Sequence, residues 1–339
     1  YHGDLSKKLV KHKKTLPLNG NNQISFDHIE ILSRNSKKKI HIKNIKKLSK
    51  YLKKKIDNDL YLISKKKKNF CNFNFNNLPN FLGILNLTPD SFSDGGKFIK
   101  NNLGYRHALN LFKSGANVID IGGESTKPGS IEVESKVEWN RIKLVIKKLA
   151  KKITLSLDTR KSEIMEKGIK NGIKLINDIS GLKHDKKTIN VLAKYKIPFV
   201  IHHIQGKPTT MQLKPKYKNV LLDIYDFFEK RIKHLRLKGI KHNKIIIDPG
   251  IGFGKNMKHN MKLIKNISIF HSLGFPIMLG ISRKRFIKDI SGDNDSKERL
   301  GGTISSSIFS AMQGVQILRV HDVNELIQSF KVFKKLNKN

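Results

Sequence analysis

The chain has 339 residues, of which 38% are hydrophobic, so it is long enough for one large domain or two ordinary ones. Its apolar runs are too short for a transmembrane helix, and no segment resembles a signal peptide. The single cysteine, Cys71, excludes an intramolecular disulfide framework and predicts a reducing, cytoplasmic setting.

The formal net charge of +41 raises the question of a nucleic-acid partner. The basic residues are 58 lysines and only 10 arginines, whereas arginine is the usual side chain for bidentate contacts with phosphates and bases. A composition rich in lysine, asparagine and isoleucine is more typical of drift in an AT-rich genome. We therefore expect no nucleic-acid partner, although the excess charge should attract anionic substrates towards clefts.

Residues 1–78 form a basic extension that differs in composition from the rest. They contain 20 Lys and Arg against 5 Asp and Glu, a KKKK run at 65–68 and an aromatic stretch, NFCNFNFNN, at 69–77. Apolar residues at helical spacing predict an amphipathic helix with a basic outer face: Ile42, Ile45, Leu48, Leu52 and Ile56. We interpret it as an outer helix of the fold, with a membrane-surface or partner-binding helix as the alternative. No motif here indicates chemistry, and the role of the extension stays open.

Residues 79–339 show a regular alternation of strand-like and helix-like segments. The helical patterns include 133–152 and 219–239. The strand-like runs are 81–88, 117–122, 153–159, 174–179, 197–203, 244–248, 276–282 and 314–320. Eight strands alternating with helices over this length predict a (β/α)8 TIM barrel of the α/β class. A doubly wound open sheet is the alternative, but its glycine fingerprint is absent.

Polar residues stand at the carboxyl end of every predicted strand. In chain order they are Asn86, Asp120, Asp158, Asn177, His202 with His203, Asp248, Ser282 with Lys284, and Arg319 with His321. Each alone is more often a cap or a turn former. In a barrel all eight strand ends meet at one rim, where such enzymes place their sites, so the set predicts an active site.

The stretch KIIIDPGIGFGK (244–255) has glycines and a lysine but matches neither a Walker loop nor a dinucleotide fingerprint. Three isoleucines run into Asp248, as in a buried parallel strand. We therefore interpret the carboxylate as the functional group. Gly250, Gly252 and Gly254 are expected to let the loop pack close beside it.

The rim residues sort into two kinds of chemistry. Asp158, Asn177 and Asp248 offer acceptors that match the amine and ring N–H of a planar aminopyrimidine-like heterocycle, with Lys284 donating to its carbonyl or ring nitrogen.

Arg319 and His321 point the same way on a strand and, with Thr126 in IGGESTKPG (121–129), suit a phosphate or pyrophosphate. Asn86 is a candidate oxygen ligand for Mg²⁺ beside such phosphates. No zinc cluster or nucleophile motif is present, so the pattern indicates loss of pyrophosphate from a bound heterocycle.

Several motifs resemble those of one family, in the same order. GILNLTPDSFSDGG (83–96), IDIGGESTKPG, LDTRKS, INDISG, DPGIGFGK, GISRKRF and RVHDV are similar to the motifs of dihydropteroate synthase, over about residues 79–330. The resemblance implies a TIM barrel, usually dimeric and using Mg²⁺. It also implies condensation of 6-hydroxymethyl-7,8-dihydropterin pyrophosphate with p-aminobenzoate to give 7,8-dihydropteroate and pyrophosphate.

The resemblance also implies roles for individual residues. The pterin would be held by Asp158, Asn177, Asp248 and Lys284, and the phosphates by Thr126, Arg319 and His321. Asn86 would sit at the metal, and Lys284, Arg319, His321 and Asp120 would form the catalytic set. The p-aminobenzoate pocket would be shaped by Thr88, Pro89, Phe92, Lys127, Pro128 and Phe253.

Two residues depart from the family pattern. Lys127 stands where arginine is common, which keeps the charge but loses the bidentate fork. His202 stands where an apolar residue is usual, and we interpret it as a structural histidine.

Three alternatives remain from the sequence. They are a pterin-binding methyltransferase acting on a corrinoid protein, a protein attached to RNA or membrane through residues 1–78, and an inactive relative. The TPDSFSDGG loop and the R-V-H strand end argue against the first, because a methyl donor has no pyrophosphate to hold.

Overall fold

A computed structural model describes residues 1–88, 102–125, 129–292 and 295–337. Eight parallel strands form the central sheet, and their order is β10-β9-β8-β7-β6-β5-β12-β11. Their bounds are β5 (Asn80–Asn86), β6 (Val118–Gly122), β7 (Leu155–Asp158), β8 (Leu175–Asp178), β9 (Phe199–His202), β10 (Ile245–Asp248), β11 (Met278–Leu279) and β12 (Ile317–Val320). The backbone N–H of Ile247 donates to the carbonyl oxygen of Pro276 over 3.0 Å, which joins β10 to the β11 side and closes the barrel. The prediction of a (β/α)8 barrel is confirmed.

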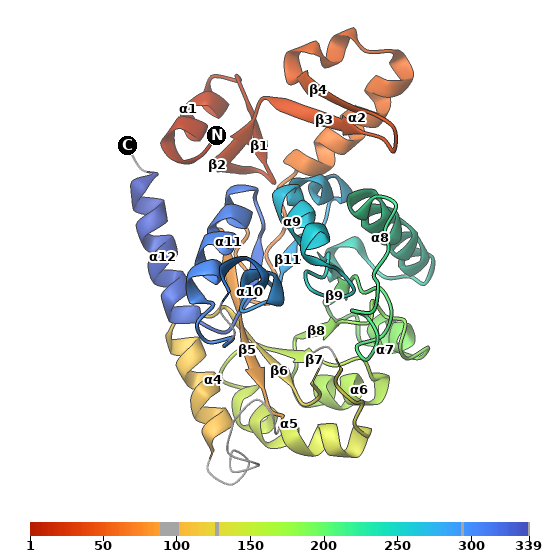
Figure 1. Ribbon diagram of the computed structural model, residues 1–339, viewed down its shortest axis with the longest axis vertical. Helices are drawn as coiled ribbons and strands as arrows, with labels where there is room; N and C mark the ends of the chain where they lie inside the picture. Colours follow the sequence, from red (N-terminus) through yellow and green to blue (C-terminus); the bar gives the residue numbers. More distant parts are fainter. Residues whose placement is uncertain (89–101, 126–128, 293–294, 338–339) are drawn as a thin grey trace.

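Helices surround the strands (Figure 1). They are α4 (Leu103–Lys113), α5 (Ser135–Leu149), α6 (Ser162–Lys170), α7 (Thr188–Tyr195), α8 (Val220–Leu237), α9 (Met257–Lys265), α10 (Arg285–Ser291), α11 (Leu300–Met312) and α12 (Val323–Leu336), with 3₁₀ helices η3 (His242–Lys244) and η4 (Ile267–Leu273). None of the helices in the described ranges is long and apolar enough to cross a membrane.

The barrel interior is apolar at one level and polar at the next. The apolar level lies towards the amino-terminal ends of the strands. It contains Leu82, Val118, Leu175, Val200, Ile246, Met278 and Ile317, which are fully buried and pack together. Because side chains on a strand alternate with a period of two, the residues two positions later face the same interior. Five of these seven positions are polar, namely Asp120, Asn177, His202, Asp248 and Arg319, and the other two are Ile84 and Gly280. The alternation therefore places an apolar layer beneath the candidate site.

The aromatic stretch before β5 closes the amino-terminal end of the barrel. Phe73 and Phe75 are buried against the apolar layer, together with Leu78. The part of the extension nearest the barrel thus supplies core side chains, which composition alone did not indicate.

The extension has secondary structure of its own. Its elements are α1 (Gly3–Lys11), β1 (Leu16–Leu18), β2 (Asn21–Phe26), β3 (His28–Leu32), β4 (Lys37–His41), η1 (Ile42–Lys47) and α2 (Lys50–Ser64), with β1 antiparallel to β2 and β3 antiparallel to β4. The prediction of one helix through Ile42–Ile56 is wrong, because η1 ends at Lys47, the backbone is extended at Leu48, and α2 begins as a separate helix at Lys50. Its apolar side chains nevertheless share a small core with β3 and β4.

Direct contacts tie the extension to the amino-terminal end of the barrel. Lys67 donates from Nζ to the carbonyl oxygen of Gly274 over 2.9 Å. The Asn19 side chain lies 3.3 Å from Nδ1 of the buried His271. Figure 1 shows the extension in red and orange at one end of the molecule, with the β5 arrow pointing away from it. The extension therefore lies at the end opposite the carboxyl rim.

Candidate active site

Three neighbouring strand ends and β12 form a buried polar cluster. Asp158 pairs in register with Gly122 of β6 on one side and with Asn177 of β8 on the other. Arg319 donates from Nε to Asp120 over 2.6 Å and from Nη2 to Asp158 over 2.7 Å. Asn177 donates to the same oxygen of Asp120 over 2.9 Å. We call Asp120, Asp158, Asn177 and Arg319 the rim cluster.

One oxygen of each acceptor in the rim cluster has no hydrogen-bond partner. Within the described part of the chain, Asp120 Oδ1, Asp158 Oδ1 and Asn177 Oδ1 are buried and unpaired. Leaving a buried acceptor unpaired costs on the order of 1–3 kcal/mol, and more for a charged group. Three such atoms on adjacent strands are suited to a ligand that brings several donors on one edge.

Asp248 ends β10 beside His202 of β9 and begins the glycine-rich loop. The Gly250 N–H donates to Asp248 Oδ1 over 2.8 Å, so the loop orients the carboxyl group. Gly250 has φ +72°, and a Cβ atom there would overlap the carbonyl oxygen of His203. Gly254 has φ +63°, and a Cβ atom there would lie 2.4 Å from the carbonyl oxygen of Gln205. The predicted clearance role is confirmed for Gly250 and Gly254, where a side chain would meet neighbouring backbone.

Lys284 and Phe253 lie together beside this loop. The Lys284 ammonium is 4.2 Å from the centroid of the Phe253 ring, within cation–π distance. A Cβ on Gly252 would be 3.2 Å from Lys284 Cδ, so the loop also covers the lysine stem. Burial, followed by the nearby Arg319, lowers the pKa of Lys284 to about 8, against the opposing effect of Asp248 and Asp158.

Burial acts in the other direction on the carboxyl groups. It raises the pKa of Asp158 to about 7, although Arg319 opposes this shift. It raises the pKa of Asp248 to about 6, against the Gly250 hydrogen bond and Lys284. Perturbed groups of both signs facing one interior are typical of a functional site.

The residues predicted to bind phosphate are only partly assembled. The Ser282 hydroxyl lies 3.0 Å from His321 Nδ1 and accepts from the His321 backbone N–H over 3.3 Å. Arg319, by contrast, directs two of its nitrogens at carboxylates. Its predicted phosphate role stays a prediction.

The remaining predicted residues divide into two groups. Asn86 ends β5, and its Oδ1 atom would lie 3.5 Å from a Cβ placed on Gly122, at the same distance as Asp158 Cβ. Thr88 is buried just after β5. Pro89, Phe92, Thr126, Lys127 and Pro128 lie outside the described residues.

The two adjacent histidines face different surroundings. His202 lies 3.1 Å from the Ile179 carbonyl oxygen through Nδ1, and its ring meets Phe253 edge-on at 4.4 Å. His203 instead contacts Phe227 and lies 3.0 Å from the ammonium of Lys255. The pair does not converge on one metal. Lys255 also donates to the Phe253 carbonyl oxygen over 2.9 Å, a buried contact that sequence reasoning missed.

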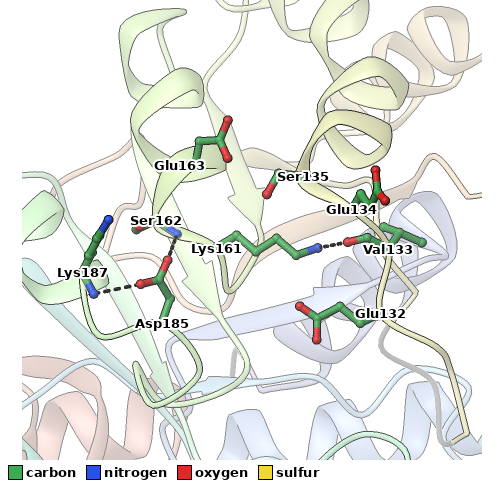
Figure 2. Close-up of a pocket in the computed structure, with 9 residues that line it drawn as sticks. All are labelled: Glu132, Val133, Glu134, Ser135, Lys161, Ser162, Glu163, Asp185 and Lys187. Atoms are coloured by element: carbon green, nitrogen blue, oxygen red, sulfur yellow. Dashed lines mark hydrogen bonds between the residues drawn. The ribbon is translucent and has the colours of Figure 1, made fainter.

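Sequence reasoning missed a second feature, a charged cluster that is separate from the rim cluster. Glu124 follows β6, Arg160 and Lys161 follow β7, and Glu138 lies in α5. The two basic residues adjoin Asp158 in the LDTRKS stretch, and this proximity was the only available signal. A hollow of about 640 Å³ lies against Lys161 and is bordered by acidic residues, including Glu132, Glu163 and Asp185 (Figure 2). This hollow lies outside the rim cluster. We assign the rim cluster, not the hollow, as the candidate active site.

Comparisons with known proteins agree with this geometry. Residues 82–321 match the family model described as pterin binding enzyme. The dihydropteroate synthase of Escherichia coli is 39% identical over 256 residues, covering 75% of this chain and 90% of the relative.

Solved structures show the same relationship. The dihydropteroate synthase of Yersinia pestis, in complex with a sulfonamide drug, superposes with a TM-score of 0.72 at 38% identity, covering 76% of this chain and 94% of that one. The Xanthomonas albilineans enzyme in complex with 7,8-dihydropteroate gives 0.69 at 32% identity, covering 76% and 93%. These relatives favour the synthase over the corrinoid methyltransferase alternative. The chain belongs to the dihydropteroate synthase family of pterin-binding enzymes.

Proposed function

We propose that the carboxyl rim of this barrel binds 6-hydroxymethyl-7,8-dihydropterin pyrophosphate and p-aminobenzoate and condenses them to 7,8-dihydropteroate and pyrophosphate. The observation that carries the proposal is the set of unpaired, buried oxygens on Asp120, Asp158 and Asn177. An aminopyrimidine edge supplies an amine and a ring N–H that would satisfy such acceptors. The family relationship supplies the reaction.

The pterin end of the site is built from three acceptors and a lysine. Asp158, Asn177 and Asp248 accept from the amine and ring N–H of the heterocycle. Lys284, held over Phe253, donates to its carbonyl oxygen or ring nitrogen. Donors and acceptors placed around the ring would fix both its plane and its orientation.

The pyrophosphate end uses positive charge. In the reaction the bond from the methylene carbon to the pyrophosphate oxygen breaks, and its electron pair leaves with the pyrophosphate. Arg319 and His321, with Thr126, would stabilise the charge that develops on the leaving group. Two Arg319 nitrogens already bind carboxylates, so its third nitrogen, Nη1, is the group that we assign to phosphate.

Mg²⁺ fits the site only if substrate phosphates and waters supply most of its ligands. In the described residues no group of three or more His, Cys, Asp or Glu side chains is placed to hold a metal. The Asn86 side-chain oxygen, at the end of β5, would supply one ligand, and Mg²⁺ usually binds through few protein oxygens when phosphates and waters complete its shell. When bound, the ion would neutralise charge on the departing pyrophosphate.

The p-aminobenzoate end completes the reaction. The aryl amine forms a C–N bond to the methylene carbon and then releases a proton. Phe253, Thr88 and the connection after β6 are the walls that we assign to the aryl ring. An aryl amine needs no strong base for this attack, which agrees with the lowered pKa values of His202 and His203, caused mainly by burial.

The test is a condensation assay on the full chain. The purified protein should form 7,8-dihydropteroate from the two substrates, with activity lost in chelator and restored by Mg²⁺. Absence of product with folded protein and added Mg²⁺ would contradict the proposal.

Two further proposals concern the state of the enzyme. We propose a homodimer, supported by large apolar side chains exposed on α11 and α12: Phe309, Met312, Val332 and Leu336. Sedimentation equilibrium should give twice the chain mass of 38.8 kDa.

We propose a cytoplasmic location, supported by the single cysteine, which leaves no intrachain disulfide to form.

A further inference from the structure

Arg283 has a backbone conformation that residues other than glycine rarely adopt. Its φ is +58°, in the left-handed region, where a side chain costs about 1–2 kcal/mol. Glycine would adopt this φ without that cost, so an arginine here indicates a use for its side chain. The residue stands between Ser282 and Lys284, two of the predicted rim residues. The strained conformation therefore occurs in the turn that carries Lys284.

Four hydrogen bonds hold Arg283 in this conformation. Its guanidinium donates to both oxygens of Asp322, from Nε over 3.0 Å and also from Nη2. Its backbone N–H donates to Thr303 Oγ1 over 3.0 Å, and its carbonyl oxygen accepts from Arg299 Nη1 over 3.0 Å. Asp322 follows β12, whereas Thr303 and Arg299 lie at the start of α11. The turn after β11 is therefore tied both to the end of β12 and to α11.

The turn directs Lys284, the residue after Arg283, to the rim. The Lys284 ammonium lies 4.2 Å from the centroid of the Phe253 ring. Burial there lowers the pKa of the ammonium, and the charges of Asp248 and Asp158 oppose this shift, so the lysine lies within reach of both carboxylates. The guanidinium of Arg283, by contrast, is bound to Asp322. A locally strained residue that several contacts hold in place is typical of a functional site.

We propose that Arg283 is a positioning residue that, through its pair with Asp322, holds Lys284 at the rim in the position that binds the pterin. The inference rests on the proposed function, which assigns Lys284 to the heterocycle. It adds a role for an ion pair whose two side chains meet each other and act through the lysine between them and the site.

The experiment is a double-mutant cycle between Arg283→Met and Lys284→Met. The measurement is the affinity for bare 6-hydroxymethylpterin, by calorimetry at pH 7. Arg283→Met removes the guanidinium and should weaken pterin binding at least about tenfold, about 1.4 kcal/mol. Lys284→Met should weaken binding by at least as much. In the Lys284→Met background, Arg283→Met should change the affinity by less than about twofold, because the group that it positions is already absent. General damage to the fold would instead weaken binding equally in both backgrounds.

Arg34→Met is the matched control. Arg34 also joins two carboxylates, because it donates to Asp223 over 2.8 Å and to Asp226 over 2.6 Å. Both acceptors lie on α8, and Arg34 itself belongs to the extension at the opposite end of the barrel from the rim. Its replacement should leave the pterin affinity within about twofold of the wild type.

A second variant covers loss of folding in the first. Arg283→Met leaves Asp322 without its cation, whereas Arg283→Met with Asp322→Asn removes both charges. This double variant should fold, as its melting temperature would show, and bind the pterin as weakly as Arg283→Met.

Three results would overturn the inference. They are an unchanged pterin affinity in a folded Arg283 variant, a tenfold loss that persists in the Lys284→Met background, and failure of both Arg283 variants to fold. Full pterin affinity in Lys284→Met, or wild-type protein that does not condense the substrates, would instead contradict the proposed function.

Discussion

Arg319 Nη2 lies 2.7 Å from Asp158 Oδ2, so a group assigned to the phosphates is bound to a group assigned to the pterin. The same guanidinium reaches Asp120 on the next strand. The two halves of the site therefore share one buried cation, and its loss should affect folding as well as binding.

We expect Arg319→Met to destabilise the protein by about 3–5 kcal/mol, because it leaves two buried carboxylates without their cation. The measurement is urea unfolding at pH 8, which is above the raised pKa of Asp158, about 7. Adding Asp120→Asn should recover part of the loss, since one unpaired charge is removed with it. Additive destabilisation by the two substitutions would show that the pair is not coupled.

Pterin affinity should weaken in acid. The pKa of Asp158 is about 7 and that of Asp248 about 6, both raised by burial, and a protonated carboxyl group no longer accepts from the amine and ring N–H. Binding measured by calorimetry should weaken at least about tenfold between pH 7 and pH 5. An affinity that is constant from pH 5 to pH 8 would contradict the acceptor assignment.

The same raised pKa values make the fold less stable as the pH rises, although they make pterin binding stronger. Between about pH 4 and pH 7 the folded state binds more protons at these two carboxyl groups than the unfolded state does. Their contribution to the free energy of unfolding therefore decreases as the pH rises through this range. Asp248→Asn should flatten this dependence, which a pH series of urea melts would measure.

Gly250→Ala should damage the site more than its backbone conformation alone explains. A Cβ at Gly250 would overlap the His203 carbonyl oxygen, which is backbone and cannot move aside cheaply. Gly239 is the matched control, because it has φ +79° and no atom within 4 Å of its Cβ position. Gly239→Ala should cost about 1–2 kcal/mol. Gly250→Ala should cost more in the same urea melts and lower pterin affinity at least about tenfold, whereas equal effects would contradict the clearance role.

Phe73→Ala should show that the extension contributes to the barrel core. Phe73 is fully buried beneath the apolar layer, so truncation should cost about 3–5 kcal/mol of unfolding free energy. Tyr51, an aromatic residue of the extension that is 82% exposed, is the control, and Tyr51→Ala should stay within about 0.5 kcal/mol. Comparable small effects from both substitutions would show that the aromatic stretch contributes little to the stability of the barrel.

The sequence predicts the barrel and much of the site because both follow from short repeats in the pattern of apolar and polar residues. The alternation of two places Asp120, Asn177 and Asp248 above apolar residues, and the parallel strands bring those positions to one rim. The pairing of Arg319 with Asp158 joins residues 161 positions apart, so no local pattern predicts it.

Other features escape for similar reasons. Lys161 meets Glu138 from 23 positions away, and nothing in the helical pattern of α5 distinguishes that glutamate from a solvated one. The extension escapes because its strands are three to six residues long and too short to give a clear period. Ile42–Ile56 carries a helical spacing, but tertiary packing against β3 and β4 divides it into two elements.

The most direct test of the central claim is the affinity for 6-hydroxymethylpterin of the wild type against Asp248→Asn, measured by calorimetry at pH 8. The substitution keeps the shape but replaces a buried charged acceptor, so the account predicts a loss of at least about a hundredfold, close to 3 kcal/mol. The melting temperature of the variant should show that it is folded. Affinities within a factor of two would contradict the assignment of the rim as a pterin site.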